Sequence, residues 1–560
     1  MAEKQYLTVD GNLVEINGEK NLLELIRKQG IKLPTFCYYT ELSIYGACRM
    51  CMVENDRGGL EAACSTPPRA GMNIKTNTGR LRKYRRMILE LLIANHCNDC
   101  ATCEQNTNCK LQAYALRFGI KNVRFPNTYK KTERKDNSSV ALDIDTGRCI
   151  LCGDCVRTCN EVQTVGAIDF AFRGSKMVVS TAFGKPLAET GCVGCGQCSA
   201  VCPTGAIVPK NNISKVWDAI DNPKFYTTVQ IAPAVRVAIG HQLRETDGEN
   251  VMGKIVAALR YMGIDAIYDT TFGADMTVIE ETKEFIERLE NNTNLPLMTS
   301  CCPGWIRYVE TKYPEFLPNI STCRSPMQMF ASVLKEKARK EGKKMFHIAV
   351  MPCTAKKYEA NREEFKVDKD PNVDAVITTK ELITMIKEAG IVFNTIDPEP
   401  VDMPFGTSSG AGVIFGVTGG VTEAVLRNAM GHKGSVKTIA KMGQRGLEEI
   451  KEFDIPFGEK ILHAAVVSGL GNAEKILNRI KDGEKFDFVE VMACPGGCIN
   501  GGGQPFDNDA KEERGKGLYT ADRHESIRNS NDNPLLKMLY QSEIAGREHE
   551  LLHVDYLKNS

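Results

Sequence analysis

The chain has little of several features that would point to common classes of protein. Its 560 residues include two tryptophans and eight histidines, and aromatic residues make up 7% of the sequence. No run of about 18 apolar residues occurs, so we expect no transmembrane helix. Lys and Arg number 71 against 70 Asp and Glu, and the resulting net charge of +1 gives no argument for a nucleic-acid or membrane partner.

Residues 1–6 lack the basic and apolar regions of a signal peptide, so the sequence predicts a cytoplasmic protein. Hydrophobic residues make up 42% of the chain and charged residues 25%, which is ordinary for globular proteins. The length of the chain implies several domains.

Cysteine is abundant, with 22 residues. Most of them fall within residues 37–202, in runs with regular spacing, and the rest lie in short segments far apart in the sequence. In a reducing compartment, clustered cysteines bind metal or carry out chemistry more often than they form disulfides. The arrangement of the cysteines is therefore the main guide to function.

The first group, with the spacing C-x10-C-x2-C-x12-C, consists of Cys37, Cys48, Cys51 and Cys64. Ferredoxin-type 2Fe–2S sites also have a long loop, a C-x2-C pair and a remote fourth cysteine, although the plant-type spacing differs. Two short alternating stretches and a helix near residues 21–29 come before this group, which is typical of a β-grasp module. Zinc is the alternative metal, and the β-grasp context favours an iron–sulfur cluster.

The second group combines one histidine with three cysteines: His96, Cys100, Cys103 and Cys109. This set suits a tetrahedral zinc ion as well as a 4Fe–4S cluster with one imidazole ligand, and the spacing leaves both open. Its position between two iron–sulfur modules favours iron. The neutral imidazole should raise the potential of such a cluster. The neighbouring Cys97 does not fit the spacing.

Two runs of C-x2-C-x2-C-x3-C give the most specific pattern, and Pro203 follows the second run. In two-cluster bacterial ferredoxins the fourth cysteine of each run binds the other cluster. We therefore assign one 4Fe–4S cluster to Cys149, Cys152, Cys155 and Cys202. The other is assigned to Cys192, Cys195, Cys198 and Cys159.

Four accessory clusters imply one-electron transfer from the surface to a buried site. The basic run Arg80–Arg86 lies on a predicted helix over residues 80–95. An acidic electron carrier could dock there by electrostatic steering. A solvated helix face is the more common reason for such a run.

From about residue 225 the pattern changes to strand-like apolar runs that alternate with helices, as in α/β folds with buried, mostly parallel strands. These runs are Thr228–Ile231, His347–Met351, Ala464–Val467 and Phe488–Met492. Such folds bind ligands at the carboxyl ends of their strands. Cysteines from three separate segments could meet there around one more 4Fe–4S cluster: Cys302, Cys353, Cys494 and Cys498.

The segments around these cysteines read T-S-C-C-P-G-W, M-P-C-T-A-K-K-Y-E and M-A-C-P-G-G-C-I-N-G-G-G-Q-P. They resemble the three signature motifs of FeFe hydrogenases. The N-terminal layout is similar to that of the large, ferredoxin-linked, monomeric members with four accessory clusters. The resemblance implies a multidomain α+β and α/β protein with four domains. These are a β-grasp 2Fe–2S domain (1–79), a 4Fe–4S domain with one histidine and three cysteine ligands (80–125), a two-cluster ferredoxin-like domain (126–210) and an H-cluster domain of two lobes (211–560).

In that family the H-cluster is a 4Fe–4S cubane joined through one cysteine to a di-iron unit with CO, cyanide and azadithiolate. The resemblance assigns the cubane to Cys302, Cys353, Cys494 and Cys498, with Cys498 as the bridge. It assigns a hydrogen bond to cyanide to Lys356, and a charge-assisted donor suits a buried anion. It assigns apolar or backbone contacts to Ala232, Pro233, Met351, Phe415 and Met492.

The resemblance also implies a proton relay. Cys301 matches the thiol that passes protons to the di-iron unit, and Ser321 matches a serine link between carboxylates. Glu281, Glu284 and Arg288 lie on one helical face. By sequence alone, a solvent-exposed helix face is the better interpretation of these three residues. The resemblance favours a role in the proton relay instead.

Three positions stay open. Met327 stands where some members carry glutamine, and Ala234 stands where some carry serine. Cys323 has no assigned ligand role, and a small buried thiol is the simplest interpretation.

The leading hypothesis is a ferredoxin hydrogenase that interconverts protons and H2. Its expected partners are ferredoxin or flavodoxin and the maturation proteins for the di-iron unit, and we expect a monomer. A hydrogen sensor of the same family is one alternative, but the chain keeps Cys301, which sensors tend to lose. The other is a subunit of an NADH-linked or electron-bifurcating complex, since sequence does not show partners.

Overall fold

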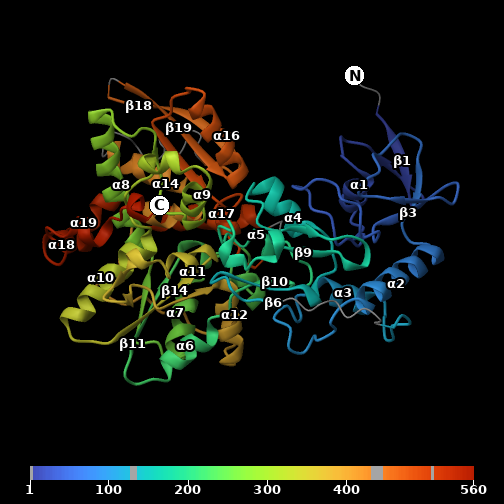
Figure 1. Ribbon diagram of the computed structural model, residues 1–560, viewed down its shortest axis with the longest axis horizontal. Coiled ribbons are helices and arrows are strands. Elements are labelled where there is room, and N and C mark those ends of the chain that lie inside the picture. Colours follow the sequence, from blue (N-terminus) through green and yellow to red (C-terminus); the bar gives the residue numbers. More distant parts are fainter. Residues whose placement is uncertain (1–3, 127–134, 431–444, 459, 506–509, 560) are drawn as a thin grey trace.

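The computed structural model describes residues 4–126, 135–430, 445–458, 460–505 and 510–559. The segments up to about residue 210 occupy the right-hand part of Figure 1, and the later residues form the larger left-hand part. The predicted multidomain α+β and α/β fold is confirmed. The chain thus places the cysteine-rich segments beside a large α/β region.

The N-terminal segment is a five-stranded sheet with one helix across it, as the β-grasp prediction requires. The sheet order is β2-β1-β5-β3-β4. Helix α1 (Leu22–Lys28) places Leu22, Leu25 and Ile26 in the core, and Asn21 caps its first turn. The strands are β1 (Tyr6–Val9), β2 (Asn12–Glu15), β3 (Met52–Asn55), β4 (Leu60–Ala62) and β5 (Asn73–Lys75).

Helices α2 (Gly79–Ala94) and α3 (Lys110–Arg117) follow the sheet. Arg85 of the basic run is buried, and its guanidinium donates to the carbonyls of Met50, Met52 and Thr76. Arg85 therefore ties α2 to the sheet. The other basic side chains of the run are exposed: Arg80, Arg82, Lys83 and Arg86.

The next segment has two short helices, α4 (Asp154–Arg157) and α5 (Gln197–Ala200). Gly153 and Gly196, which come directly before them, have φ of +76° and +72°, a region that glycine adopts at little cost. Arg157 donates to the carbonyls of Ser43 and Cys37 and thereby joins this segment to the first sheet. The strands are β6 (Lys135–Asp136), β7 (Leu142–Asp145), β8 (Asp169–Ala171), β9 (Val178–Ser180) and β10 (Ile207–Pro209).

The large α/β region is built on two sheets, which contain the four predicted strands. One sheet is wholly parallel, in the order β12-β11-β14-β17. Its strands are β11 (Tyr226–Ile231), β12 (Ala266–Asp269), β14 (Met345–Met351) and β17 (Ala375–Thr378). The other, in the order β13-β20-β19-β18, comprises β13 (Leu297–Met298), β18 (Ile450–Phe457), β19 (Lys460–Ser468) and β20 (Phe488–Met492).

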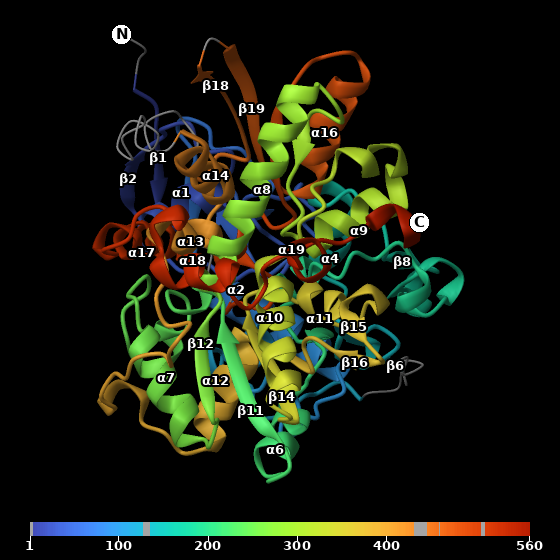
Figure 2. The ribbon, with the colours of Figure 1, turned by 90° about the vertical axis from the view of Figure 1, so that its left-hand side faces the viewer.

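Helices cover both sheets, and the 21-residue helix α8 lies between them in Figure 2. A small ribbon of β15 (Lys366–Val367) and β16 (Asp370–Pro371) follows β14. The helices are α6 (Ile213–Ile220), α7 (Met252–Tyr261), α8 (Thr271–Asn291), α9 (Pro303–Lys312), α10 (Pro326–Lys340), α11 (Ala355–Glu359), α12 (Thr379–Glu388), α13 (Gly410–Val413), α14 (Gly420–Met430), α16 (Leu470–Lys481), α17 (Lys511–His524), α18 (Pro534–Gln541) and α19 (Glu548–Leu552).

The carboxyl ends of strands from both sheets lead to the same place. Strand β14 ends at Met351, just before Cys353, and β20 ends at Met492, just before Cys494. The segment after β13 contains Cys301 and Cys302. Parallel strands place ligands at this end, so the topology brings three distant segments together.

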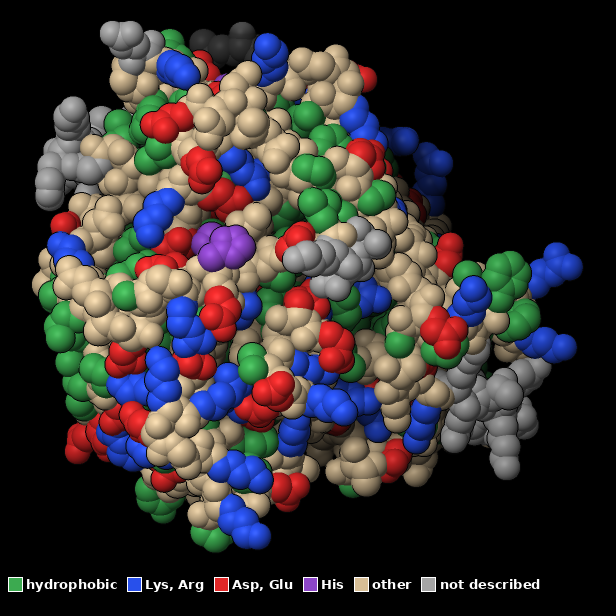
Figure 3. All heavy atoms as spheres, turned by 60° about the vertical axis from the view of Figure 1, so that its left-hand side comes forward, with side chains coloured by type: hydrophobic (Ala, Val, Ile, Leu, Met, Phe, Trp, Pro, Cys, Tyr) green, Lys and Arg blue, Asp and Glu red, His purple; other side chains and the backbone are tan. Residues whose placement is uncertain are grey.

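In the part of the chain that the structure describes, no helix has the length and apolar character needed to cross a membrane. The face in Figure 3 shows Lys and Arg interspersed with Asp and Glu, without a continuous area of one sign. This agrees with the formal net charge of +1.

Arg427 of α14 provides a test of the core around α17. Its side chain is fully buried and donates to both oxygens of the buried Asp522, at 3.0 and 2.9 Å, and to Glu423. Replacing it (Arg427→Met) leaves two buried carboxylates poorly compensated, so we expect the free energy of unfolding to fall by about 3 kcal/mol. Denaturant titration measures this loss. The control Arg445→Met removes a partly exposed partner of the same carboxylates and should cost about 1 kcal/mol or less. Equal losses would contradict this account.

Candidate functional site

A cavity lies where the carboxyl ends of the two sheets meet. Its lining is mainly apolar, and Lys356 supplies the charged side chain among the residues that line it. The lining includes five cysteines from three segments: Cys301, Cys302, Cys353, Cys494 and Cys498. It also includes the predicted contact residues Ala232, Pro233, Met351, Phe415 and Met492.

The thiols in this cavity are close enough to influence one another. Burial raises the pKa of the Cys494 thiol well above its usual value, and the nearby Cys353, Cys195, Cys302 and Cys498 raise it further. Burial likewise raises the pKa of Cys353 to about 11. Thiolates buried in an apolar cavity need a positively charged partner. The four cysteines Cys302, Cys353, Cys494 and Cys498 suit a 4Fe–4S cluster. The donor set therefore fits the cluster that the sequence predicts here.

Glycines let backbone segments pack closely around the cavity. Gly497 has φ of +92°, and a Cβ there would lie 2.6 Å from the Thr418 amide nitrogen. A Cβ on Gly501 would lie 2.2 Å from the Pro352 carbonyl oxygen. A Cβ on Gly502 would lie 2.4 Å from the Cys195 carbonyl oxygen. Only glycine fits these positions without a shift of the backbone.

The two ferredoxin-type sets occupy separate pockets. One pocket is lined by Cys149, Cys152, Cys155 and Cys202. The other is lined by Cys159, Cys192, Cys195 and Cys198. The fourth cysteine of each run thus lies with the first three of the other run. Cys195 also lines the central cavity, which makes the second pocket its direct neighbour.

The structure also brings the first cysteine group together. The Cys48 amide nitrogen lies 3.3 Å from Cys37 Sγ. The pKa of Cys64 is raised, first by its hydrogen bond with Cys51 and then by burial. The charges of Cys51, Cys37 and Cys48 add to the shift. Tetrathiolate chemistry of this kind fits a 2Fe–2S cluster.

The second group lies between α2 and α3, and its histidine is buried. The Asn98 amide donates to His96 Nδ1 at 3.2 Å. Burial raises the pKa of Cys109, and the nearby Cys103 and Cys100 add to the shift. Cys97 is exposed, with its sulfur 3.8 Å from His96 Nδ1.

A row of polar side chains leads from the cavity toward α8. Glu281 is fully buried on α8, and its charge acts on the Cys301 thiol. The Ser321 hydroxyl donates to Glu284 Oε2 at 2.8 Å. Arg288 donates to Glu284 Oε1 at 2.5 Å and anchors the far end through the carbonyls of Asn294, Pro318, Asn319 and Ile320. On the helical face that sequence alone predicts to be solvated, Glu281 and Arg288 are buried and Glu284 is only partly exposed.

The surroundings of Glu281 change the protonation of its carboxyl group at neutral pH. Burial raises its pKa to about 8, and the charge of Glu284 adds to the shift. Its oxygens make no well-aligned hydrogen bond among the described residues, although the Ser321 hydroxyl and the Ser300 amide lie near enough to oppose the shift. The carboxyl group is therefore protonated at neutral pH and can donate a proton.

Lys356 has a partner that sequence reasoning missed. Its ammonium donates to Glu359 Oε2 at 2.8 Å and to the Cys301 carbonyl at 3.2 Å. Burial lowers the pKa of Lys356, but Glu359 outweighs this effect, so the lysine stays charged. Glu359 is also held by the Ser325 hydroxyl at 3.0 Å. The i,i+3 spacing of Lys356 and Glu359 within M-P-C-T-A-K-K-Y-E could have indicated this ion pair.

The open positions lie close to the cavity. Met327 and Ala234 both line it. The side-chain amide of Gln230 donates to the Met327 carbonyl at 3.0 Å, and that of Gln504 donates to the Ala234 carbonyl at 2.9 Å. Cys323 is fully buried, as predicted, and its sulfur lies 3.9 Å from Glu284 Oε2.

The fold and the cavity define an iron–sulfur protein whose cysteine-lined pockets lead to a buried site in an α/β domain. Residues 226–502 match the family "Iron only hydrogenase large subunit, C-terminal domain", and residues 508–559 match "Iron hydrogenase small subunit". Residues 4–79, 85–124 and 148–206 match a 2Fe–2S binding domain, the NADH-ubiquinone oxidoreductase-G iron–sulfur binding region and a 4Fe–4S dicluster domain.

Relatives match over nearly the whole chain. The NADP-reducing hydrogenase subunit HndD of Solidesulfovibrio fructosivorans is 41% identical, over 99% of this chain and 98% of its own. Iron hydrogenase 1 of Clostridium pasteurianum is 36% identical, over 98% of this chain and all of its own. A solved variant of the FeFe-hydrogenase HydA1 from Chlamydomonas reinhardtii superposes with a TM-score of 0.53 at 35% identity, over 62% of this chain and 98% of that one.

The chain belongs to the iron-only hydrogenase family, as the signature motifs predicted. It is a hydrogenase-type oxidoreductase that acts on H2 and protons. Its domains are those of 2Fe–2S and 4Fe–4S clusters and of an H-cluster.

The raised pKa of Glu281 has a spectroscopic consequence. A carboxyl group with a pKa of about 8 is protonated at pH 6 and ionised well above pH 8. Infrared difference spectra between these conditions should include a buried carboxyl band that disappears with a midpoint near pH 8. The buried Asp154, whose pKa is raised to about 7, should contribute a separate band with a lower midpoint. The matched variant Glu281→Gln should lose the band near pH 8 and keep that of Asp154. A band near pH 8 that persists in the variant, or the absence of this band from the unmodified protein, would refute the assignment.

Proposed function

We propose that the chain is an FeFe hydrogenase that reversibly reduces protons to H2 with electrons from reduced ferredoxin or flavodoxin. The observation that carries this proposal is the central cavity, where six cysteines and Lys356 line one buried space. A pocket with its own four cysteines adjoins this space through Cys195.

In this proposal each cysteine group holds the cluster that its donors fit. Cys37, Cys48, Cys51 and Cys64 hold a 2Fe–2S cluster. Three accessory 4Fe–4S clusters are held by the His96 group and the two ferredoxin-type sets. The H-cluster cubane is held by Cys302, Cys353, Cys494 and Cys498, and Cys498 connects it to the di-iron unit. The four domains keep the boundaries 1–79, 80–125, 126–210 and 211–560.

When bound, the di-iron unit with its CO, cyanide and azadithiolate supplies the chemistry of hydrogen formation. Around it, Met351, Phe415 and Met492 exclude water, and the Lys356 ammonium provides a charge-assisted donor for an anionic ligand. Maturation proteins would have to supply this unit.

The polar row supplies protons. Glu284, at the outer end, passes a proton through the Ser321 hydroxyl to Glu281, and Cys301 carries it into the cavity. Glu281 suits this role because its raised pKa keeps the proton available near neutral pH. Arg288 acts as a positioning residue, because it fixes Glu284 without facing the cavity.

Electrons enter from the opposite side. In Figure 1 the first sheet, α2 and α3 lie on the right, and α4 and α5, which carry ferredoxin-type cysteines, lie between them and the large α/β region. The exposed side chains of Arg82, Lys83 and Arg86 on α2 offer a basic surface for an acidic carrier. The protein would act as a monomer in the cytoplasm.

A second proposal concerns the carrier. The relative HndD is named as a subunit of an NADP-reducing hydrogenase, and it matches this chain over almost its full length. In this second proposal the chain would receive electrons from a partner subunit instead of free ferredoxin. Hydrogen evolution by the isolated matured chain with reduced ferredoxin supports the first proposal. Activity that requires a co-purified NADPH-oxidising subunit supports the second.

The proton relay predicts a large effect at Cys301. Cys301→Ala removes the thiol between Glu281 and the cavity, so hydrogen evolution with an artificial donor should fall by about 100-fold or more. Iron content and the infrared bands of CO and cyanide should not change.

Cys323→Ala is the matched control, because it removes another buried thiol beside the relay. This variant should keep its turnover. Comparable losses in both variants would rule out a specific role for Cys301.

The basic surface predicts a salt-dependent interaction with the carrier. The triple variant Arg82→Glu, Lys83→Glu, Arg86→Glu should raise the KM for ferredoxin about tenfold at low salt and flatten its salt dependence. Steady-state kinetics with a small uncharged electron donor, which does not depend on the basic surface, should be the same in the variant and the unmodified protein. An unchanged KM for ferredoxin would place the docking site elsewhere.

A further inference from the structure

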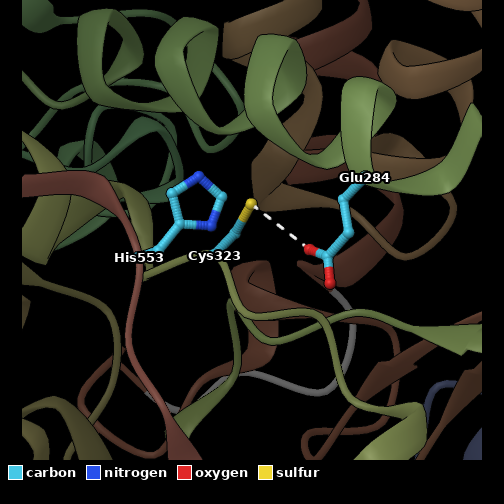
Figure 4. A group of neighbouring side chains, drawn as sticks. All are labelled: Glu284, Cys323 and His553. Atoms are coloured by element: carbon cyan, nitrogen blue, oxygen red, sulfur yellow. Dashed lines mark hydrogen bonds between the residues drawn. The ribbon is translucent and has the colours of Figure 1, made fainter. Parts of the chain in front are cut away.

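Three side chains of metal-binding type converge at the outer end of the polar row (Figure 4). They are Glu284 from α8, Cys323 from the loop before α10 and His553 from the segment after α19. One donor atom of each lies within 4.8 Å of the other two. The backbones of Cys323 and His553 form an antiparallel bridge, so the fold itself holds these two residues together.

The orientation of His553 suits a metal ligand. Its Nε2 lies 3.2 Å from Glu280 Oε2, so this carboxylate holds the proton on Nε2. Nδ1 then accepts a hydrogen bond from the Thr322 hydroxyl at 2.8 Å, and it lies on the side of the ring that points toward Cys323 (Figure 4). A bound ion would take the place of this hydrogen bond. A carboxylate behind a histidine is the usual arrangement at metal sites, where it fixes the tautomer of the ligand.

The local charge also favours a cation. Glu280 and Glu284 are balanced by Lys283 and Arg288, which bind them at 2.8 and 2.5 Å. Ionisation of the Cys323 thiol would leave one negative charge in excess. A divalent ion that displaces the thiol proton supplies the balancing charge.

The geometry points to a binding site for a zinc-class divalent cation at Glu284, Cys323 and His553 that slows hydrogen turnover when filled. Glu, Cys and His are ligands that zinc accepts, and three protein ligands leave a fourth position for water. The side chains of Glu284 and His553 are 12% and 11% exposed, so the ion can reach them from solvent, while Cys323 closes the inner side. The ring of the exposed His549 stacks on that of His553, with the ring centres 5.1 Å apart.

The inhibitory effect follows from the position of Glu284. A cation bound to Oε2 competes with the hydrogen bond that Ser321 donates to the same oxygen. The carboxylate would then no longer pass protons inward. This consequence rests on the proposed role of Glu284 in the proton relay, whereas the binding of the ion does not.

Binding is tested on the matured holoenzyme with ZnCl2 under anaerobic conditions. X-ray absorption at the zinc edge should show one sulfur ligand at about 2.3 Å together with nitrogen and oxygen ligands. Cys323→Ala should remove the sulfur from this shell and raise the zinc dissociation constant about tenfold or more, and His553→Gln should weaken binding similarly. Cys97→Ala removes the other unassigned thiol and should change neither result.

Turnover is measured in the same samples with an artificial electron donor. Zinc should inhibit hydrogen evolution reversibly, with relief by a chelator and weaker inhibition at lower pH, because protons compete for the ligands. About tenfold more zinc should be needed for half-inhibition of Cys323→Ala, whose activity without zinc is retained.

Absence of saturable zinc binding would overturn the proposed zinc site. The same zinc ligands and the same zinc inhibition in Cys323→Ala as in the unmodified protein would overturn it as well. Zinc bound through Cys323 without any inhibition would overturn the inhibitory function, and would show that protons bypass Glu284. Failure of the hydrogenase proposal itself would appear separately, as loss of activity without zinc.

Discussion

The cost of burying thiolates in an apolar cavity is the constraint on which the rest of the structure depends. Cys494 and its neighbours lie in a space where burial strongly disfavours the ionised thiol. A cluster that supplies positive charge relieves this cost, and it also demands thiols in one fixed arrangement. Strands from two sheets end at the cavity because only such a topology brings three distant segments together. Gly497, Gly501 and Gly502 let those segments approach closely enough.

In the proposed function, electrons and protons would reach this space from different sides, and each route would use a different property of the chain. The electron side is a series of cysteine pockets, of which the last shares Cys195 with the cavity. The proton side is a row of polar groups on α8, in the loop before α10 and at Cys301 after β13, with Glu281 kept protonated by burial. Lys356 and Glu359 hold a charge pair at the edge of the cavity without opening it to water. The fold therefore keeps the two routes apart until they meet.

Much of this arrangement was predictable because its determinants are local. The spacing within each cysteine run specified the exchange of Cys159 and Cys202 between pockets, and apolar runs such as Phe488–Met492 marked buried strands. Contacts between residues distant in sequence were not predictable. Arg85, in the middle of a basic run, is buried under the first sheet. Cys323 and His553 lie far apart in the sequence and become neighbours through a β-bridge that no periodicity indicates. The burial of Glu281 and Arg288 likewise follows from packing.

The central claim is that the cysteine-lined cavity between the two sheets holds an iron cluster at the end of a series of iron clusters. Anomalous diffraction at the iron edge from crystals of the matured protein tests it most directly. The account predicts about twenty irons, with one group between Cys302, Cys353, Cys494 and Cys498 and another adjoining it at Cys195. Iron peaks confined to the N-terminal pockets, or a central cavity without iron in a protein that evolves hydrogen, would contradict the account.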